Sequence, residues 1–217
     1  MPPGRAIRSA RGAARPRRRI RLDNDQRRAQ LLELAKRAFS DRSYDDVSID
    51  DLARIAGISK GLLYHYFPTK RDLYVAGLRE ISDELVAAVT GVSEDLPPVD
   101  LIRHSVDAYL DHISRHSRAF VALMRGGIGS DPEVAAVVDS VRTRLFDKLL
   151  AGSTLATQIA GSVRFETAIR GWIGFVEAAS IDWCANPRLS RLDLRELVTA
   201  VLFDVLKLAT PAPVAGR

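Results

Sequence analysis

The region from Ser48 to Lys70 concentrates side chains that can donate hydrogen bonds to nucleic acid. Lysine, serine, tyrosine and histidine groups donate to phosphate oxygens and base edges, and a glycine lets the backbone approach closely. The candidates are Ser48, Ser59, Lys60, Gly61, Leu62, Tyr64, His65, Tyr66 and Lys70. Leu62 suits a thymine methyl group. For Tyr64, His65 and Tyr66, packing or simple surface exposure is the alternative role.

Two short helices joined by a tight turn would present these side chains. Ser48 is a predicted N-cap, with Asp51 three positions later, and apolar residues then recur at helical spacing. Gly57 follows, where glycine adopts a left-handed conformation without a steric penalty. Ser59 is the second N-cap and opens a helix from Lys60 to Phe67. We therefore predict a helix-turn-helix, although a helical hairpin inside an all-α core has similar spacing.

A third helix is predicted to begin directly after this pair. Pro68 ends the preceding helix, and Thr69 caps the next one with Asp72 as its capping-box partner. Lys70 lies in the first turn, where its charge would add to the free N–H groups of the helix terminus. This arrangement predicts a phosphate clamp, and the helix is expected to continue to about Thr90.

The segment GISKGLLYHYFPTKRDLY resembles the signature of the TetR family of bacterial transcriptional regulators, and the resemblance extends from Asn24 to about Leu78. It implies a three-helix DNA-binding domain followed by a larger helical domain that dimerises and usually holds an inducer. Carried over position by position, it assigns Ser59, Tyr64 and Lys70 to phosphate contact and Lys60, Gly61, Leu62 and His65 to the groove. Leu62 departs from the small hydroxyl residue often found there.

The N-terminal arm carries the basic excess of the chain. The net charge is +5, but residues 1–22 contain eight arginines and no acidic residue. Such a segment lacks the apolar residues needed to fold alone and is expected to be disordered. We assign Arg17, Arg18, Arg19 and Arg21 to the minor groove or to phosphates beside the first helix. A transit peptide and an inert tail are the alternatives.

Bulk composition is typical of a protein with a substantial core. The chain has 217 residues, is 47% hydrophobic, and contains no apolar run long enough to span a membrane. Cys184 is the single cysteine, so no intramolecular disulfide can form, which suits a cytoplasmic location. We expect a disordered arm over 1–22, a DNA-binding domain over 23–72, an effector and dimerisation domain over 73–209, and a disordered tail over 210–217.

The remaining pattern predicts helices throughout, so the fold class is all-α: an N-terminal three-helix helix-turn-helix domain plus a C-terminal helical domain. Apolar residues recur at helical spacing in 23–41, 99–117, 118–125, 133–150, 163–185 and 192–208, and a glycine-rich loop is expected near Gly127. The last two helices are apolar around much of their circumference. They suit a four-helix interface between two copies of the chain, and the alternative is that they simply form the domain core.

A ligand cavity is expected between the C-terminal helices, because the resemblance implies one. The candidate lining residues are Tyr109, Ile113, Phe120, Met124, Phe146, Trp172 and Phe175, and core packing is the alternative for each. Such a lining favours a lipophilic or aromatic effector. His112 and His116 share a helix face, but two histidines without a third ligand are weak grounds for a metal site, and none is assigned.

These features predict a ligand-responsive repressor that binds a pseudo-palindromic, double-stranded operator as a homodimer and is released by the effector. A transcriptional activator and a DNA-binding protein without an effector remain as alternatives. An enzyme is disfavoured because no paired carboxylates, Ser-His-Asp arrangement or zinc pattern stands out. No cofactor and no membrane partner are expected.

Overall fold

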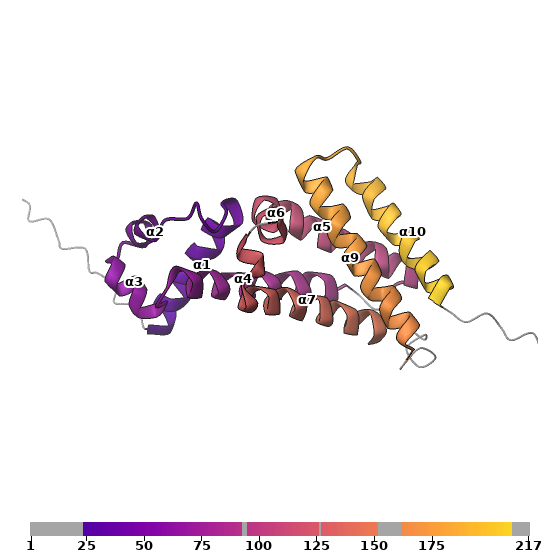
Figure 1. Ribbon diagram of the computed structural model, residues 1–217, viewed down its shortest axis with the longest axis horizontal. Coiled ribbons are helices and arrows are strands. Elements are labelled where there is room, and N and C mark those ends of the chain that lie inside the picture. Colours follow the sequence, from indigo (N-terminus) through magenta and orange to yellow (C-terminus); the bar gives the residue numbers. More distant parts are fainter. Residues whose placement is uncertain (1–23, 93–94, 126, 152–161, 210–217) are drawn as a thin grey trace, which may run out of the picture.

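The computed structural model describes residues 24–92, 95–125, 127–151 and 162–209, and the described residues are helical with no strand. The helices are α1 (Asn24–Asp41), α2 (Ile49–Ala56), α3 (Lys60–Tyr66), α4 (Lys70–Thr90), α5 (Pro98–Arg115), α6 (Ser117–Arg125), α7 (Pro132–Ala151), α9 (Val163–Ala185) and α10 (Arg191–Ala209). The molecule is elongated: α1–α3 lie at one end, α4 and α7 run side by side along its length, and α9 and α10 lie at the other end (Figure 1).

Local hydrogen bonds form the helix-turn-helix as the spacing predicts. The Ser48 hydroxyl oxygen accepts from the backbone N–H of Asp51 at 3.3 Å. Gly57 has a φ of 66°, in the left-handed region, and its N–H turns back toward the carbonyls that end α2. The Ser59 hydroxyl oxygen accepts from the N–H of Leu62 at 3.1 Å. Two caps and one left-handed glycine therefore set the angle between α2 and α3.

Helix α4 begins with the predicted capping box. The Thr69 hydroxyl accepts from the N–H of Asp72, and the Asp72 carboxylate accepts from the N–H of Thr69, both at 3.0 Å. This reciprocal pair satisfies two of the N–H groups that a helix start leaves open. The first turn of α4 is therefore held at a defined position directly after α3.

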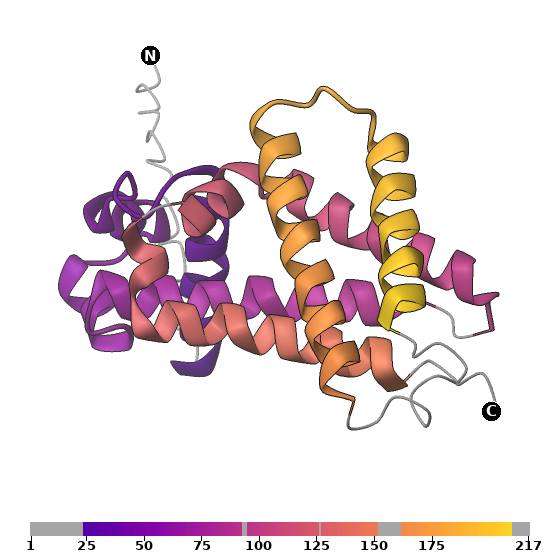
Figure 2. The same cartoon turned by 45° about the vertical axis from the view of Figure 1, so that its right-hand side comes forward.

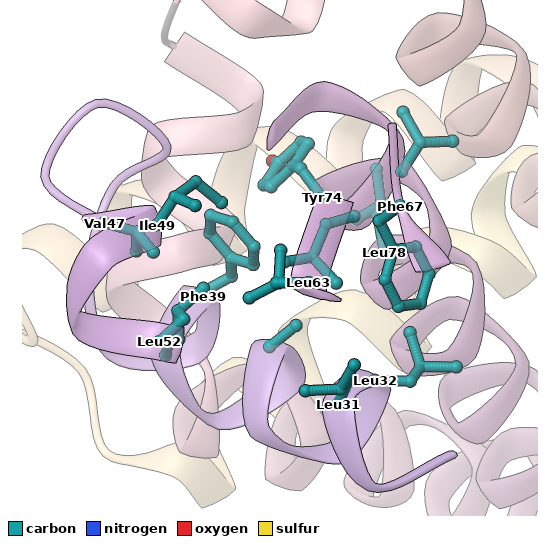
Figure 3. Packing of buried hydrophobic residues seen from close by; sticks show 14 of the residues in the cluster. Leu31, Leu32, Phe39, Val47, Ile49, Leu52, Leu63, Phe67, Tyr74 and Leu78 are labelled. Carbon is teal, nitrogen blue, oxygen red and sulfur yellow. The ribbon is translucent and has the colours of Figure 1, made fainter. Parts of the chain in front are cut away.

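Two apolar clusters hold the fold together. The first joins α1–α3 to α4 and α7, and Leu63 lies fully buried at its centre, with Phe39 and Phe67 on either side (Figure 3). The second joins α5 and α7 to the α9–α10 hairpin, which lies across the long helices (Figure 2). Trp172 ties the hairpin together by donating its indole N–H to the Val198 carbonyl at 3.0 Å.

Helix α4 belongs to both clusters. Leu73, Tyr74 and Leu78 are buried in the first, while Leu85 and Val89 pack against the second. The domain boundary that we predict at residue 72 therefore falls inside a continuous helix, and the first core takes residues from both sides of it. A displacement of α4 would therefore disturb the packing of both clusters.

The structure corrects the sequence-based interpretation of the glycine-rich segment. We expected a plain loop, whereas residues Gly127–Ser130 form a short 3-10 helix before α7. Asp131 then caps α7, because its carboxylate accepts from the N–H groups of Glu133 and Val134. Ile128 packs against the first core, and this contact explains why residues Gly127–Ser130 adopt regular structure.

Gly57 and Gly61 form a matched pair for testing the turn. In both positions an added Cβ would meet no atom within 4 Å, but only Gly57 has a positive φ. We expect Gly57→Ala to lower the free energy of unfolding by about 1–2 kcal/mol through backbone strain. Gly61→Ala should raise it by up to about 1 kcal/mol through helix propensity. Urea denaturation measures both, and equal effects would contradict the strain argument.

Candidate DNA-contacting surface and effector cavity

The exposed face of α3 carries the residues that we expect in the DNA groove. Leu63 and, just past the helix end, Phe67 point into the core, which leaves Gly61, Leu62 and His65 exposed to solvent. Leu62 is 39% exposed although it is large and apolar. A short helix with one buried edge and an exposed mixed face has the form that major-groove binding requires.

Lys60 has a partner that the sequence did not reveal. Its ammonium group lies 2.9 Å from a carboxylate oxygen of Asp50 on α2. This hydrogen bond raises the pKa of Lys60 above its usual value. Both side chains are well exposed, so the pair can open at small cost when a phosphate or base edge competes for the lysine.

Four other predicted contact residues already serve the fold. The hydroxyl of Tyr66 donates to the side-chain oxygen of Asn24 at 2.7 Å, which ties the end of α3 to the start of α1. Ser48 and Ser59 are N-caps, but their hydroxyl oxygens accept, so their O–H groups remain able to donate. Tyr64 is half-buried against the first core. The packing role that we left open for Tyr64 and Tyr66 is present in the structure, because both rings pack against the first core.

Lys70 lies at the start of α4 as the phosphate-clamp prediction requires. Its ammonium group lies 4.4 Å from the centroid of the Tyr44 ring and 3.4 Å from the carbonyl oxygen of Asp45. These contacts hold the charge beside the N-terminus of α4 without neutralising it with a carboxylate. The arm residues Arg17, Arg18, Arg19 and Arg21 lie outside the described residues.

A cavity of about 590 Å³ lies between the helices of the larger domain. Five of the seven predicted lining residues contribute to it: Tyr109, Ile113, Phe120, Met124 and Trp172. Phe146 does not line it, because its ring is buried in the second cluster with the Arg170 guanidinium 5.0 Å from the ring centroid. Phe175 instead lines a separate groove of about 360 Å³ beside α10. The spacing of apolar residues predicts the helix on which each ring lies. It does not predict which face of that helix turns toward the cavity.

The cavity reaches the core of the DNA-binding end. Phe39, Tyr74 and Leu78 belong to the first apolar cluster and also line the cavity. The Tyr74 ring packs edge-on against Phe39 and Tyr44, with centroids 4.9 and 5.1 Å apart. Burial raises the pKa of Tyr74 to about 12, with a smaller contribution from Tyr44. Sequence reasoning missed Phe39 because it assigned this residue to the DNA-binding domain. It missed Tyr74 and Leu78, which fall within the predicted effector domain, because it drew the lining candidates from later helices.

Polar side chains in the cavity wall were also missed as a group. His112 and His116 lie with ring centroids 4.9 Å apart, and both line the cavity. Burial lowers the pKa of His112 to about 4, with His116 as the next cause, and burial also lowers the pKa of His116. Across the cavity, Arg142 makes a two-bonded ion pair with Glu177, each contact 2.8 Å. The sequence did offer one indication for the histidines, because His112 and His116 follow Tyr109 at helical spacing.

Ion pairs connect α4 to the start of α7. The Arg71 guanidinium donates to both carboxylate oxygens of Asp131 at 2.6 Å and to Glu133 at 2.8 Å. Arg79, two turns along α4, donates to the other oxygen of Glu133 at 2.6 Å. Arg71 lowers the pKa of Asp131 to about 2. This network holds the DNA-proximal half of α4 against α7.

Among the described residues, no cluster brings together three or more His, Cys, Asp or Glu residues that could hold a metal ion. Within the same residues, no helix is both long enough and apolar enough to cross a membrane.

Comparisons with known proteins agree with this geometry. The family model described as "Bacterial regulatory proteins, tetR family" matches residues 31–76, and the model described as "Tetracyclin repressor-like, C-terminal domain" matches residues 98–205. A TetR-family transcriptional regulator from Streptomyces coelicolor has a solved structure with a TM-score of 0.75 and 35% identity, covering 86% of this chain and 82% of that one.

Three curated relatives are described as transcriptional regulators. The regulator EthR of Mycobacterium tuberculosis is 34% identical over 190 residues, which is 86% of this chain and 76% of EthR. The transcriptional activator FasR of Mycolicibacterium smegmatis is 36% identical over 133 residues, which is 59% of this chain and 61% of FasR. The match thus spans less than two thirds of FasR, and it spans 47% of the regulator RutR of Escherichia coli.

The buried His112 predicts a loss of stability in acid. Its pKa is about 4 in the fold against an ordinary 6.5, so the unfolded chain binds more protons between these values. The free energy of unfolding should therefore fall as pH drops from 6.5 toward 4. His112→Gln should flatten that part of the profile, whereas His104→Gln, which alters an exposed histidine on the same helix, should not. Thermal unfolding across this range measures both, and parallel profiles would contradict the assignment.

Proposed function

This chain belongs to the TetR family of bacterial transcriptional regulators, and from that premise we propose that it binds operator DNA as a dimer and is released by a lipophilic ligand. The observation that carries the proposal is the cavity of about 590 Å³, whose wall includes α4 residues that also pack against the DNA-binding unit, α1–α3. We assign the ligand to this cavity because most of its lining is apolar.

The proposed DNA contacts fall into two groups. Lys70, Tyr64 and the O–H groups of Ser48 and Ser59 would position the protein on phosphates, since these contacts carry no sequence information. Lys60, Gly61, Leu62 and His65 would face the major groove from α3, and the arginine arm would add affinity through the minor groove or phosphates. Tyr66 would contribute indirectly, by holding α3 against Asn24.

We place the dimer interface on α9 and α10. Leu192, Leu197 and Leu208 of α10 are exposed in the single chain, at 56%, 44% and 70%. Beside them, the groove of about 360 Å³ is lined by Phe175, Val201 and Val205 among others. Exposed apolar helices around an apolar groove suit a four-helix contact between two copies. A dimer also brings two α3 helices to two half-sites of a pseudo-palindrome.

The proposed coupling runs through α4. A ligand in the cavity would press on Tyr74 and Leu78, and Tyr74 contacts Tyr44, over which Lys70 lies. The Arg71 and Arg79 ion pairs set the resting position of α4 against α7. A ligand that binds better to a displaced α4 would shift the population away from the operator-binding arrangement.

Repression is the direction that we propose, with activation as the alternative. A ligand that displaces α4 would separate two half-site readers, which lowers operator affinity and relieves repression. The alternative has a specific observation in its favour, because the relative FasR is described as a transcriptional activator. A reporter placed behind the operator, assayed with and without the protein, distinguishes the two.

Substitutions at the DNA surface should separate positioning from sequence preference. Lys70→Ala should weaken binding to operator and unrelated DNA alike and reduce the salt slope by about 1 for each protomer. His65→Ala should instead change the preferred base in its half-site. Lys207→Ala removes the same charge from the far end of α10 and should leave affinity unchanged. Fluorescence anisotropy over a salt series measures these effects, and a Lys70 variant with an unchanged slope would refute the clamp.

A substitution that fills the cavity should imitate the ligand. Leu85 of α4 lines the cavity, so Leu85→Trp should lower operator affinity between about fivefold and about 150-fold without breaking the dimer. Leu85→Ala enlarges the cavity and should preserve operator binding. Loss of binding by a fluorescent lipophile confirms that the tryptophan fills the space. If the tryptophan fills the cavity while operator affinity stays at the wild-type value, cavity occupancy is not coupled to DNA binding.

A further inference from the structure

We propose that His112 and His116 form a polar subsite in the cavity that binds a neutral hydrogen-bonding group of the effector, a hydroxyl or a carbonyl. The inference deepens the proposed function and rests on it for the location of the ligand. It narrows the effector from any lipophile to a neutral, mainly apolar molecule with one such group near its end.

The first support is a pair of buried ring nitrogens without partners. His112 is only 4% exposed, and its Nε2 has no hydrogen-bond partner among the described residues. Nδ1 of His116 is also buried and has no hydrogen-bond partner among the described residues. Burying a polar atom without a partner is costly, and such atoms are unusual in native proteins. Both rings line the cavity, so a group inside it can supply the missing hydrogen bonds.

The second support is the charge around the pair. Burial keeps both imidazoles neutral near pH 7, and a neutral ring donates from one nitrogen and accepts at the other. The charged groups that act on the pKa of the rings include Arg115, which pairs with Asp111, Glu84, which pairs with Lys36, and Asp41. Of the cations that line the cavity, Arg142 is held by Glu177 and Asp139, and Lys148 is not free either. Among the described residues of the lining, no free cation is therefore left for an anion, whereas a hydroxyl or carbonyl needs none.

The third support is the position of the pair. His112 and His116 lie at the end of α5, where Lys36 and Asp41 of α1 are close enough to influence the pKa of His116. Other lining residues, among them Leu149, Phe165 and Leu202, are apolar and belong to or pack against the second cluster. A ligand would therefore direct its polar group toward the DNA-binding unit and its apolar part toward α9 and α10.

Metal binding is the competing chemistry for two histidines four residues apart. The described residues contain no third His, Cys, Asp or Glu that joins them in a group able to hold a metal. Because the proposed bonds are short-range and neutral, removing one ring nitrogen should affect only ligands that carry a hydrogen-bonding group.

The test compares three probes of similar size on the full chain without DNA: octanol, nonane and octanoate. Each displaces a neutral fluorescent lipophile, N-phenylnaphthylamine, from the cavity at neutral pH. Wild type should bind octanol about tenfold more tightly than nonane, once both affinities are corrected for their partition from water. Octanoate should bind more weakly than octanol, because the described residues of the lining offer no free cation.

Variants identify the histidines as the cause. His112→Phe should reduce octanol affinity about tenfold and leave nonane affinity unchanged or improved, which also shows that the cavity is intact. His112→Gln keeps a donor and an acceptor and should restore part of the loss. His104→Phe is the matched control, because His104 is exposed on the same helix and does not line the cavity.

Three results would overturn the subsite. These are an octanol preference that survives in both His112→Phe and His116→Phe, equal losses for octanol and nonane, and tightest binding by octanoate. These outcomes differ from a failure of the proposed function. If octanol binds through the histidines but operator affinity does not change, the subsite stands and the regulatory coupling falls. If operator affinity responds to nonane and octanol equally, the coupling stands and the subsite falls.

Discussion

The packing of Tyr74 is the contact on which the two ends of the molecule depend. Its ring lies against Phe39 and Tyr44 of the DNA-binding end and also forms part of the cavity wall. A close-packed aromatic contact cannot absorb a displacement gradually, because interiors have little free volume. Under the proposed function, a ligand in the cavity would therefore displace the core that supports α3, and the ion pairs of Arg71 and Arg79 would oppose that movement from the side of α7.

The same constraint explains why the cavity combines apolar walls with a few polar groups. A large unfilled apolar space forfeits dispersion contacts, so it persists in a stable fold only if the remaining clusters are well packed. Here Leu63 and Leu110 are fully buried on either side of the cavity. The unpaired nitrogens of His112 and His116 add a second cost, which a suitable ligand would remove. The free energy that the unfilled space and the unpaired nitrogens cost the folded protein would be recovered when a ligand binds there.

Much of the DNA-binding end follows from sequence because its signals are local. Ser48, Ser59 and Thr69 cap helices within three residues of themselves, and Gly57 needs no distant partner to adopt its conformation. The cavity was harder to predict. Tyr109 and Trp172 were expected in its lining and are there, but Phe146 and Phe175 lie elsewhere, because helical spacing does not specify which face meets which neighbour. Lys60 was expected to face the groove, and its pairing with Asp50 on the preceding helix was not anticipated.

The amino-acid sequence by itself determined the helix-turn-helix, the capping of α4, the all-α class and the resemblance to a family of regulators. These depend on spacings of a few residues, over which backbone hydrogen bonding and steric limits act directly. Only the tertiary structure decided that α4 belongs to two cores, that the cavity reaches Phe39 and Tyr74, and that two histidines face it without partners. These depend on helix rotation and crossing, which are settled by the packing of residues far apart in the chain.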